Sequence, residues 1–148
     1  MEILIIFIGF IIDRITKVWA LNRLAAGSDI VVLKNLFSFS YLENRGAAFG
    51  IFQNKVLILS ILTSVVIMGM IYYLVKYKPA SKLLRYSLAL IISGAIGNLV
   101  DRFVYKYVVD FILLHYNDVY YFATFNVADM LVVSGTFLLS ICILKDEN

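Results

Sequence analysis

The chain has 148 residues, 62% of them hydrophobic, and its mean hydropathy is +0.91. A soluble domain is typically about 45–50% apolar, so these values exclude an ordinary soluble protein and predict an integral membrane protein. The net charge of +3 does not indicate nucleic-acid binding, because the basic residues form no patch interleaved with aromatic rings. The length suits one membrane-embedded domain over residues 1–148.

The first apolar run, Ile3 to Leu21, predicts a retained helix and not a cleaved leader. It starts with Glu2 instead of a basic residue, and Asp13, Arg14 and Lys17 interrupt it. Asp13 and Lys17 are four positions apart with the acid first, so they share a helix face and can form an ion pair. Such a pair either lets the helix insert or helps to shape a site, and the sequence leaves both roles open.

Residues Leu24 to Lys55 do not form a span. Serine alternates with aromatic residues from Phe37 to Tyr41, which favours a strand, and Ile30–Leu33 with a Lys34–Asn35 turn completes a hairpin. The aromatic face of this sheet is expected at the membrane interface. Small residues in Glu43–Gly50 allow close backbone approach, although their spacing alone favours a plain turn.

Two further spans follow. Val56 to Val75 carries no charge and has the length that a bilayer requires, about 20 residues. The loop Lys76–Arg85 has four basic residues and no acid, so it belongs in the cytoplasm. The next apolar run, Tyr86 to Val100, contains small residues that suit tight helix packing in lipid. These residues are Ser93, Gly94, Ala95 and Gly97.

Tyr105 to Phe122 is aromatic and β-prone, with a turn candidate at Asn117–Asp118, and is expected to add a strand to the hairpin. Phe122 to Leu144 predicts the fourth span. The predicted fold is therefore an all-α integral membrane protein: four transmembrane helices and a small extracytoplasmic antiparallel β-sheet. Both termini are expected in the cytoplasm.

Asp129 is the only charged residue between Val119 and Leu144, and an intramembrane acid costs roughly 2.5–3.5 kcal/mol on insertion scales. Helix rise places it about 24 Å from Lys145, close to the outer surface of a hydrocarbon layer about 30 Å thick. Asn98 and Asp101 reach similar depths, about 20 and 24 Å from Arg85. Polar groups that converge near one surface indicate a membrane-embedded substrate more than an ion path.

Two aspartates brought together can hydrolyse an amide without a nucleophilic side chain or a metal. Like charges a few ångströms apart cannot both ionise easily, so the pair shares a proton. The ionised member activates water and the protonated member polarises the carbonyl. Asp101, Asp110 and Asp129 all remain candidates on these grounds, with Asp101 favoured as a structural acid because Arg102 or another basic residue can neutralise it.

Five segments together resemble the motifs of bacterial lipoprotein signal peptidases (signal peptidase II). Each motif is weak alone, but they occur in order over nearly the whole chain. They are Asp13-Arg14-Ile15-Thr16-Lys17, Asn44 to Gly50, Ser93 to Arg102, Val108 to Phe111 and Phe125 to Asp129. The resemblance implies an aspartic endopeptidase that removes the signal peptide from diacylglyceryl-modified prolipoproteins, cutting before the lipidated cysteine.

The resemblance further implies that Asp110 and Asp129 are the catalytic pair. By the family pattern, Asn44, Asn98, Arg102 and Asn126 line the site, and Asp13 and Lys17 support it. Arg14 and the short tail after Lys145 depart from the pattern. The expected location is the bacterial cytoplasmic (inner) membrane, with the active site near the outer face. The expected partners are the lipidated precursor and membrane lipid, with no nucleic acid, and a monomer is expected.

No cofactor or metal is expected, because the single Cys142 and single His115 provide no metal-ligand spacing. Two other functions compete with peptidase. A small proton-coupled transporter also uses intramembrane acids, but the second span lacks polar residues and the acids lie near one face. In a scaffold, polar groups merely hold helices together, and Asp→Asn changes would be nearly silent.

Overall fold

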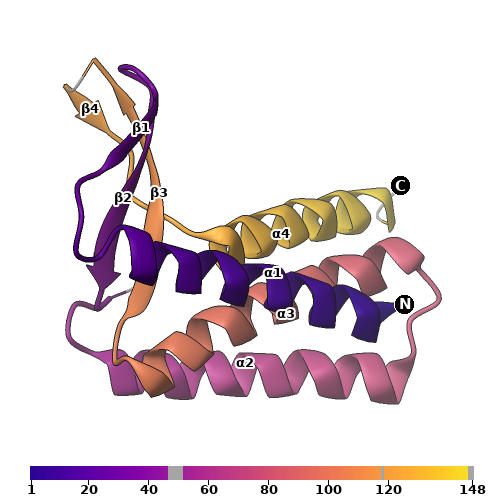
Figure 1. Cartoon of the computed structure of the whole chain (residues 1–148). Helices are drawn as coiled ribbons and strands as arrows, with labels where there is room; N and C mark the ends of the chain where they lie inside the picture. The colour runs from indigo at the N-terminus through magenta and orange to yellow at the C-terminus, as the bar shows by residue number, and fades with distance from the viewer. Residues whose placement is uncertain (47–51, 118, 147–148) are drawn as a thin grey trace.

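The computed structural model describes residues 1–46, 52–117 and 119–146. Within them, four long helices lie side by side, and a small sheet rises from one end of this bundle (Figure 1). The elements in chain order are α1 (Glu2–Arg23), β1 (Ile30–Leu33), β2 (Phe37–Asn44), α2 (Val56–Tyr77), α3 (Lys82–Val104), β3 (Val108–Tyr116), β4 (Tyr120–Tyr121) and α4 (Val127–Asp146).

Helix α3 is the centre of the bundle and packs against α1, α2 and α4. The predicted close packing of its small residues is confirmed at Gly94 and Gly97. A Cβ atom on Gly94 would collide with the carbonyl oxygen of Ala128 on α4, and one on Gly97 would lie 2.5 Å from Asp13 Oδ2 on α1. Glycine at these two positions therefore lets three helices approach each other closely.

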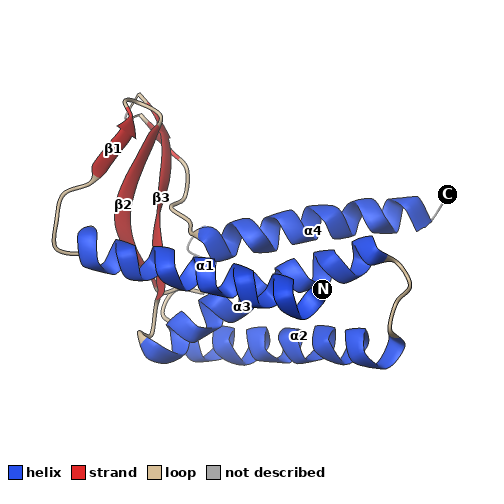
Figure 2. Ribbon diagram, turned by 45° about the vertical axis from the view of Figure 1, so that its right-hand side comes forward, coloured by secondary structure: helices blue, strands red, loops and turns tan. Residues whose placement is uncertain are grey.

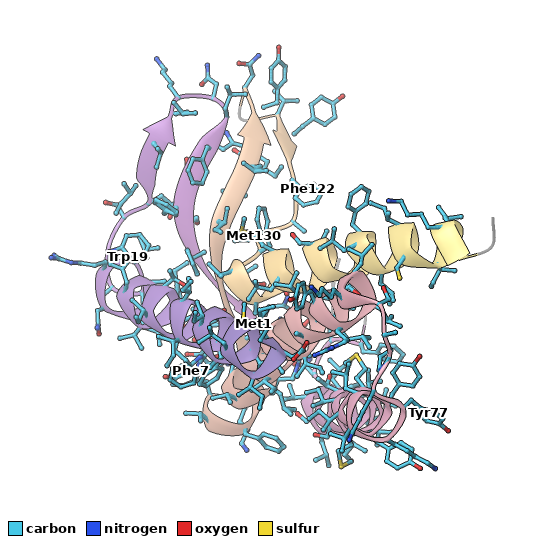
Figure 3. All side chains as sticks on the ribbon, turned by 90° about the vertical axis from the view of Figure 1, so that its right-hand side faces the viewer. Met1, Phe7, Trp19, Tyr77, Phe122 and Met130 are labelled. Carbon is cyan, nitrogen blue, oxygen red and sulfur yellow. The ribbon has the colours of Figure 1, made fainter. Side chains whose placement is uncertain are left out.

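The outer surface of the bundle is apolar. Apolar side chains such as Phe7 and Tyr77 project outward from the helices (Figure 3), and both are about three-fifths exposed. Of the helices in the described residues, three are long and apolar enough to cross a membrane: Val56–Tyr77, Lys82–Val104 and Val127–Lys145. An apolar surface of this extent is what a lipid environment requires.

The sheet has the antiparallel order β1-β2-β3-β4 and leaves the bundle at the end remote from both chain termini (Figure 2). The predicted hairpin and the predicted additional strand are both confirmed. The aromatic residues of β2 do not simply face the membrane interface, because Phe39 packs edge-on against Trp19 of α1 with ring centroids 5.1 Å apart. Phe111 of β3 joins the same cluster, which fixes the sheet to the end of α1.

Two helix starts differ from the prediction. Helix α3 begins at Lys82 instead of Tyr86, because Ser81 caps it by accepting the Leu84 N–H at 3.3 Å. Helix α4 begins at Val127 instead of Phe122, because the backbone of Phe125 exchanges hydrogen bonds with Ile112 of β3. The apolar residues before Val127 therefore pair with the sheet, which hydropathy alone does not reveal.

The residues Ala47–Gly50 of the second motif and Asp118 of the expected turn lie outside the described residues. Asn117 has a positive φ of 50°, a conformation that asparagine tolerates better than most residues and that suits a turn.

Candidate active site

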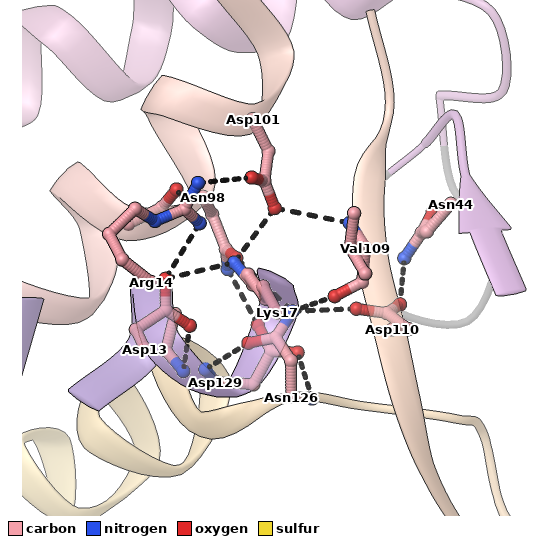
Figure 4. Close-up of polar contacts among 12 residues, drawn as sticks. Asp13, Arg14, Lys17, Asn44, Asn98, Asp101, Val109, Asp110, Asn126 and Asp129 are labelled. Carbon is pink, nitrogen blue, oxygen red and sulfur yellow. Dashed lines mark hydrogen bonds and ion pairs between the residues drawn. The ribbon is translucent and has the colours of Figure 1, made fainter. Parts of the chain in front are cut away.

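The candidate catalytic acids meet where the sheet joins the bundle. Asp110 is the third residue of β3, and Asp129 lies in the first turn of α4 (Figure 4). Asp110 is 1% exposed, whereas Asp129 is only partly buried. A strand and a helix thus supply the two carboxyl groups.

Asn126 contacts both acids. Its side-chain Nδ2 donates to Asp110 Oδ1 at 2.6 Å, and its backbone N–H donates to Asp129 Oδ2 at 3.1 Å. Its Oδ1 in turn accepts the backbone N–H of Asp129 at 2.9 Å. The reciprocal bonds between Asn126 and Asp129 form a capping box, which begins α4 and fixes the Asp129 carboxylate at the same time.

The remaining carboxylate oxygens accept from two further asparagines. Asn44 Nδ2, at the end of β2, donates to Asp110 Oδ2 at 2.9 Å. Asn98 Nδ2, on α3, donates to Asp129 Oδ1 at 2.7 Å. Three asparagines from three different parts of the chain therefore hold all four oxygens, which leaves each carboxylate little rotational freedom.

The environment of Asp110 favours its protonated form. Burial raises the pKa of Asp110 from an ordinary value of 3.8 to about 7, and the nearby charge of Asp129 acts in the same direction on this pKa. Hydrogen bonds from Asn44 and Asn126 act in the opposite direction. A carboxyl group that keeps its proton near neutral pH beside a second carboxylate can act as a general acid.

A buried ion cluster adjoins the acids (Figure 4). The predicted pair forms, since Lys17 Nζ lies 3.2 Å from Asp13 Oδ2, and Lys17 also donates to Asn98 Oδ1 at 2.8 Å. Asp101 pairs with Lys17 at 2.8 Å and with Arg14 at 2.7 Å. The cations that neutralise Asp101 thus come from α1.

Arg102 does not pair with Asp101, although the two are adjacent in sequence. Neighbouring helix residues point in different directions. Arg102 instead donates from Nη2 to the carbonyl oxygen of Gly46 at 3.2 Å, and the Gly46 N–H donates to Asn44 Oδ1 at 3.0 Å. Arg102 and Asn44 therefore both hold Gly46, two residues after the end of β2, beside the site.

All eight predicted site residues lie in this connected region, but no role was predicted for Arg14. Arg14 was a departure from the family pattern, yet it joins Asp13 at 2.8 Å and Asp101 at 2.7 Å. Its spacing of three from Lys17 could have revealed a shared helix face. Among the described residues, no group of three or more His, Cys, Asp or Glu side chains is placed to hold a metal ion.

Comparison with known proteins identifies the family. A family described as "Signal peptidase (SPase) II" matches residues 5–145. A lipoprotein signal peptidase of Clostridium novyi (strain NT) is 58% identical over 146 residues, which is 99% of each chain. One of Clostridium tetani (strain Massachusetts / E88) is 60% identical over 148 residues, covering 100% of this chain and 95% of that one.

A solved structure of a bacterial membrane enzyme superposes with a TM-score of 0.89 at 30% identity, over 99% of this chain and 89% of that chain. The structural match extends over the bundle and the sheet together, and the family match runs through every residue of the site described above. The chain therefore belongs to the signal peptidase II family.

Proposed function

We propose that this protein removes the signal peptide from diacylglyceryl-modified prolipoproteins, with Asp110 and Asp129 as its catalytic pair. Family membership makes it an aspartic peptidase, and its relatives carry the name lipoprotein signal peptidase. The observation that carries the choice of residues is the contact of Asn126 with both carboxylates. The comparisons give no support to a transporter.

In the proposed reaction, Asp129 is ionised and Asp110 is protonated. Asp129 takes a proton from water while the water oxygen attacks the scissile carbonyl carbon, and Asp110 gives its proton to the carbonyl oxygen. As the tetrahedral intermediate collapses, the C–N bond breaks and Asp129 passes its proton to the leaving nitrogen. Asp110 recovers a proton from the hydroxyl group of the intermediate, which restores the starting state.

The proposed topology has four spans, with α1 as the first. Asp13 and Lys17 point into the bundle, whereas the outer face of α1 is apolar, and this reverses the pattern of a helix on a soluble protein. Both termini and the basic loop between α2 and α3 lie at the end opposite the sheet (Figure 1). The positive-inside rule then puts the termini in the cytoplasm and the site near the outer face.

We further propose that the protein acts as a monomer in the bacterial cytoplasmic membrane. One chain supplies every hydrogen bond described above for the two carboxylates. Membrane lipid would contact the apolar outer surface of the helices, and the lipidated precursor would approach the site from within the bilayer.

The proposal is tested with purified protein in lipid and a diacylglyceryl-modified precursor. Asp110→Asn and Asp129→Asn are each expected to lower cleavage by about 10²–10⁴-fold, the usual contribution of a general acid or base. Asp29→Asn, the same change at an exposed position, is the matched control and is expected to cut at the wild-type rate. Normal cleavage by either Asp110→Asn or Asp129→Asn would refute the assignment.

A further inference from the structure

Each proposed catalytic acid directly follows a residue whose backbone N–H is held by another buried aspartate. The Val109 N–H, just before Asp110, donates to Asp101 Oδ2 at 3.1 Å. The Ala128 N–H, just before Asp129, donates to Asp13 Oδ1 at 3.0 Å. The same relation therefore occurs twice, once on a strand and once at a helix start.

These two anchoring aspartates are joined to each other by cations. Lys17 contacts both carboxylates, and Arg14 contacts both as well, at 2.8 Å for Asp13 and 2.7 Å for Asp101. Asp13, Lys17 and Asp101 are each at most 1% exposed. Two acids and two bases give the cluster no net formal charge, which allows carboxylates to serve as backbone acceptors inside the protein.

We propose that Asp13 and Asp101 are a matched pair of positioning residues. They set the relative position of Asp110 and Asp129 through the backbone, and Lys17 and Arg14 make the two anchors a single unit. This inference rests on the proposed function, in which Asp110 and Asp129 share the chemistry. It gives the first-helix motif, Arg14 included, a defined role, because α1 then aligns β3 with α4.

Asp110 and Asp129 need such anchors because they lie on different elements. One is on β3 and the other on α4, and their carboxyl groups must stay in register to share a proton. A misplacement of about 1 Å can cost about 10²-fold in rate. Asn126 and Asn98 hold the carboxyl groups themselves, whereas the two anchors hold the peptide backbone on which those side chains stand.

Substitutions at Asp13 and Asp101 separate the anchor role from a simple ion pair, because the hydrogen-bond acceptor and the negative charge can be removed independently. Asparagine at position 13 or 101 keeps an oxygen that accepts the backbone N–H but loses the charge. Leucine has a similar size and loses both. Because a charge-assisted hydrogen bond is about twice as strong as a neutral one, the Asn variants should fall between wild type and the Leu variants.

The test measures cleavage and amide hydrogen exchange on Asp13→Asn, Asp13→Leu, Asp101→Asn and Asp101→Leu in lipid. We expect the Leu variants to lower kcat by about 10²-fold, with KM within about threefold of wild type, and the Asn variants to lower it less. Exchange should accelerate at the Val109 amide in the Asp101 variants and at the Ala128 amide in the Asp13 variants. The pH profile of kcat should also shift.

Ser93→Ala is the matched control. Ser93 Oγ donates to the Ile6 carbonyl oxygen at 2.9 Å, so this variant also removes a partly buried hydrogen bond between α1 and α3 but touches neither anchor. It is expected to lower stability while the pH profile of kcat and exchange at Val109 and Ala128 stay unchanged.

The inference is overturned if the Leu variants keep the wild-type kcat and pH profile while Asp110→Asn is inactive. If the Leu variants do not accumulate in the membrane, hydrogen exchange in the Asn variants decides. Faster exchange throughout the bundle overturns the inference, and so does unchanged exchange at both the Val109 and the Ala128 amide. Cleavage by Asp110→Asn or Asp129→Asn would instead refute the proposed function, so the two failures are distinguishable.

Discussion

Helices α2 and α3 have 22 and 23 residues, and both are apolar enough to cross a membrane, but they bury different kinds of side chain. Helix α2 buries Leu59, Ser60 and Ile67, and its serine hydroxyl groups bond within the helix. Helix α3 buries Asn98 and Asp101 along with a series of small residues. Two helices that are both apolar enough to cross a membrane therefore have different roles: α2 faces lipid, and α3 carries residues of the site.

The comparison explains how α3 tolerates polar residues inside a membrane. Asn98 and Asp101 each contact Lys17, and Asp101 also contacts Arg14, so none of these groups faces lipid without a partner. The hydroxyl groups of Ser60 and Ser64 on α2 are satisfied by backbone carbonyl oxygens of their own helix. An amide or a charge needs a partner from another helix, whereas a serine does not.

The largest contrast is expected from polar side chains on the two helices. Asn98→Leu removes the bonds to Asp129 and Lys17 and should lower cleavage by about 10²-fold or more, because the Asp129 carboxylate then keeps only its bond from the Asn126 N–H. Ser64→Ala on α2 removes only a bond to its own helix and should keep the wild-type rate. The two rates, measured side by side on a lipidated precursor, test the contrast. Equal rates would show that α3 has no special part in the reaction.

Glycine substitutions on the two helices should give a second, smaller contrast, in stability. Gly94→Ala on α3 should lower the free energy of unfolding by about 1–3 kcal/mol, because the added Cβ collides with the Ala128 carbonyl oxygen. Gly69→Ala on α2 meets no atom within 4 Å and should be neutral or slightly stabilising. Unfolding in detergent by denaturant or heat measures both. A larger loss at Gly69 than at Gly94 would contradict the packing described here.

The pH dependence of stability gives the smallest contrast. Helix α2 has no carboxylate, whereas Asp110 has a pKa raised to about 7. The folded protein therefore binds this proton more tightly than the unfolded chain, and stability falls as pH rises from about 4 to about 7. Asp110→Asn should flatten this fall, measured as unfolding free energy against pH. The exposed control Asp29→Asn should keep the wild-type slope, and an equal slope in both variants would argue against a buried, protonated Asp110.

Most of the fold could be predicted because spans and strands have distinct periods. The hairpin of β1 and β2 follows from alternating residues, and α2 follows from an uncharged run. The start of α4 could not be predicted from hydropathy, because Phe122 to Phe125 are largely apolar. The backbone pairing of Phe125 with Ile112 keeps the helix from starting before Val127. Amino-acid composition does not predict that pairing.

The site was only partly predictable, for a similar reason. Local spacing reveals the Asp13–Lys17 pair, since both residues lie on one helix. The choice among Asp101, Asp110 and Asp129 depends on partners distant in sequence. Asp101 is neutralised by Lys17 and Arg14 of α1, whereas its chain neighbour Arg102 points to Gly46. Before the fold was known, only the family resemblance could supply that distinction.

In the proposed reaction, Asp110 and Asp129 share one proton while they cut a peptide bond. The pH profile of kcat/KM on a diacylglyceryl-modified precursor tests it most directly, because this ratio reports the free enzyme. The pair titrates as a unit, so we predict an apparent pKa near 7 on the basic side and a fall of about tenfold per pH unit above it. A rate that stays level to about pH 9, far above that pKa, would contradict the account.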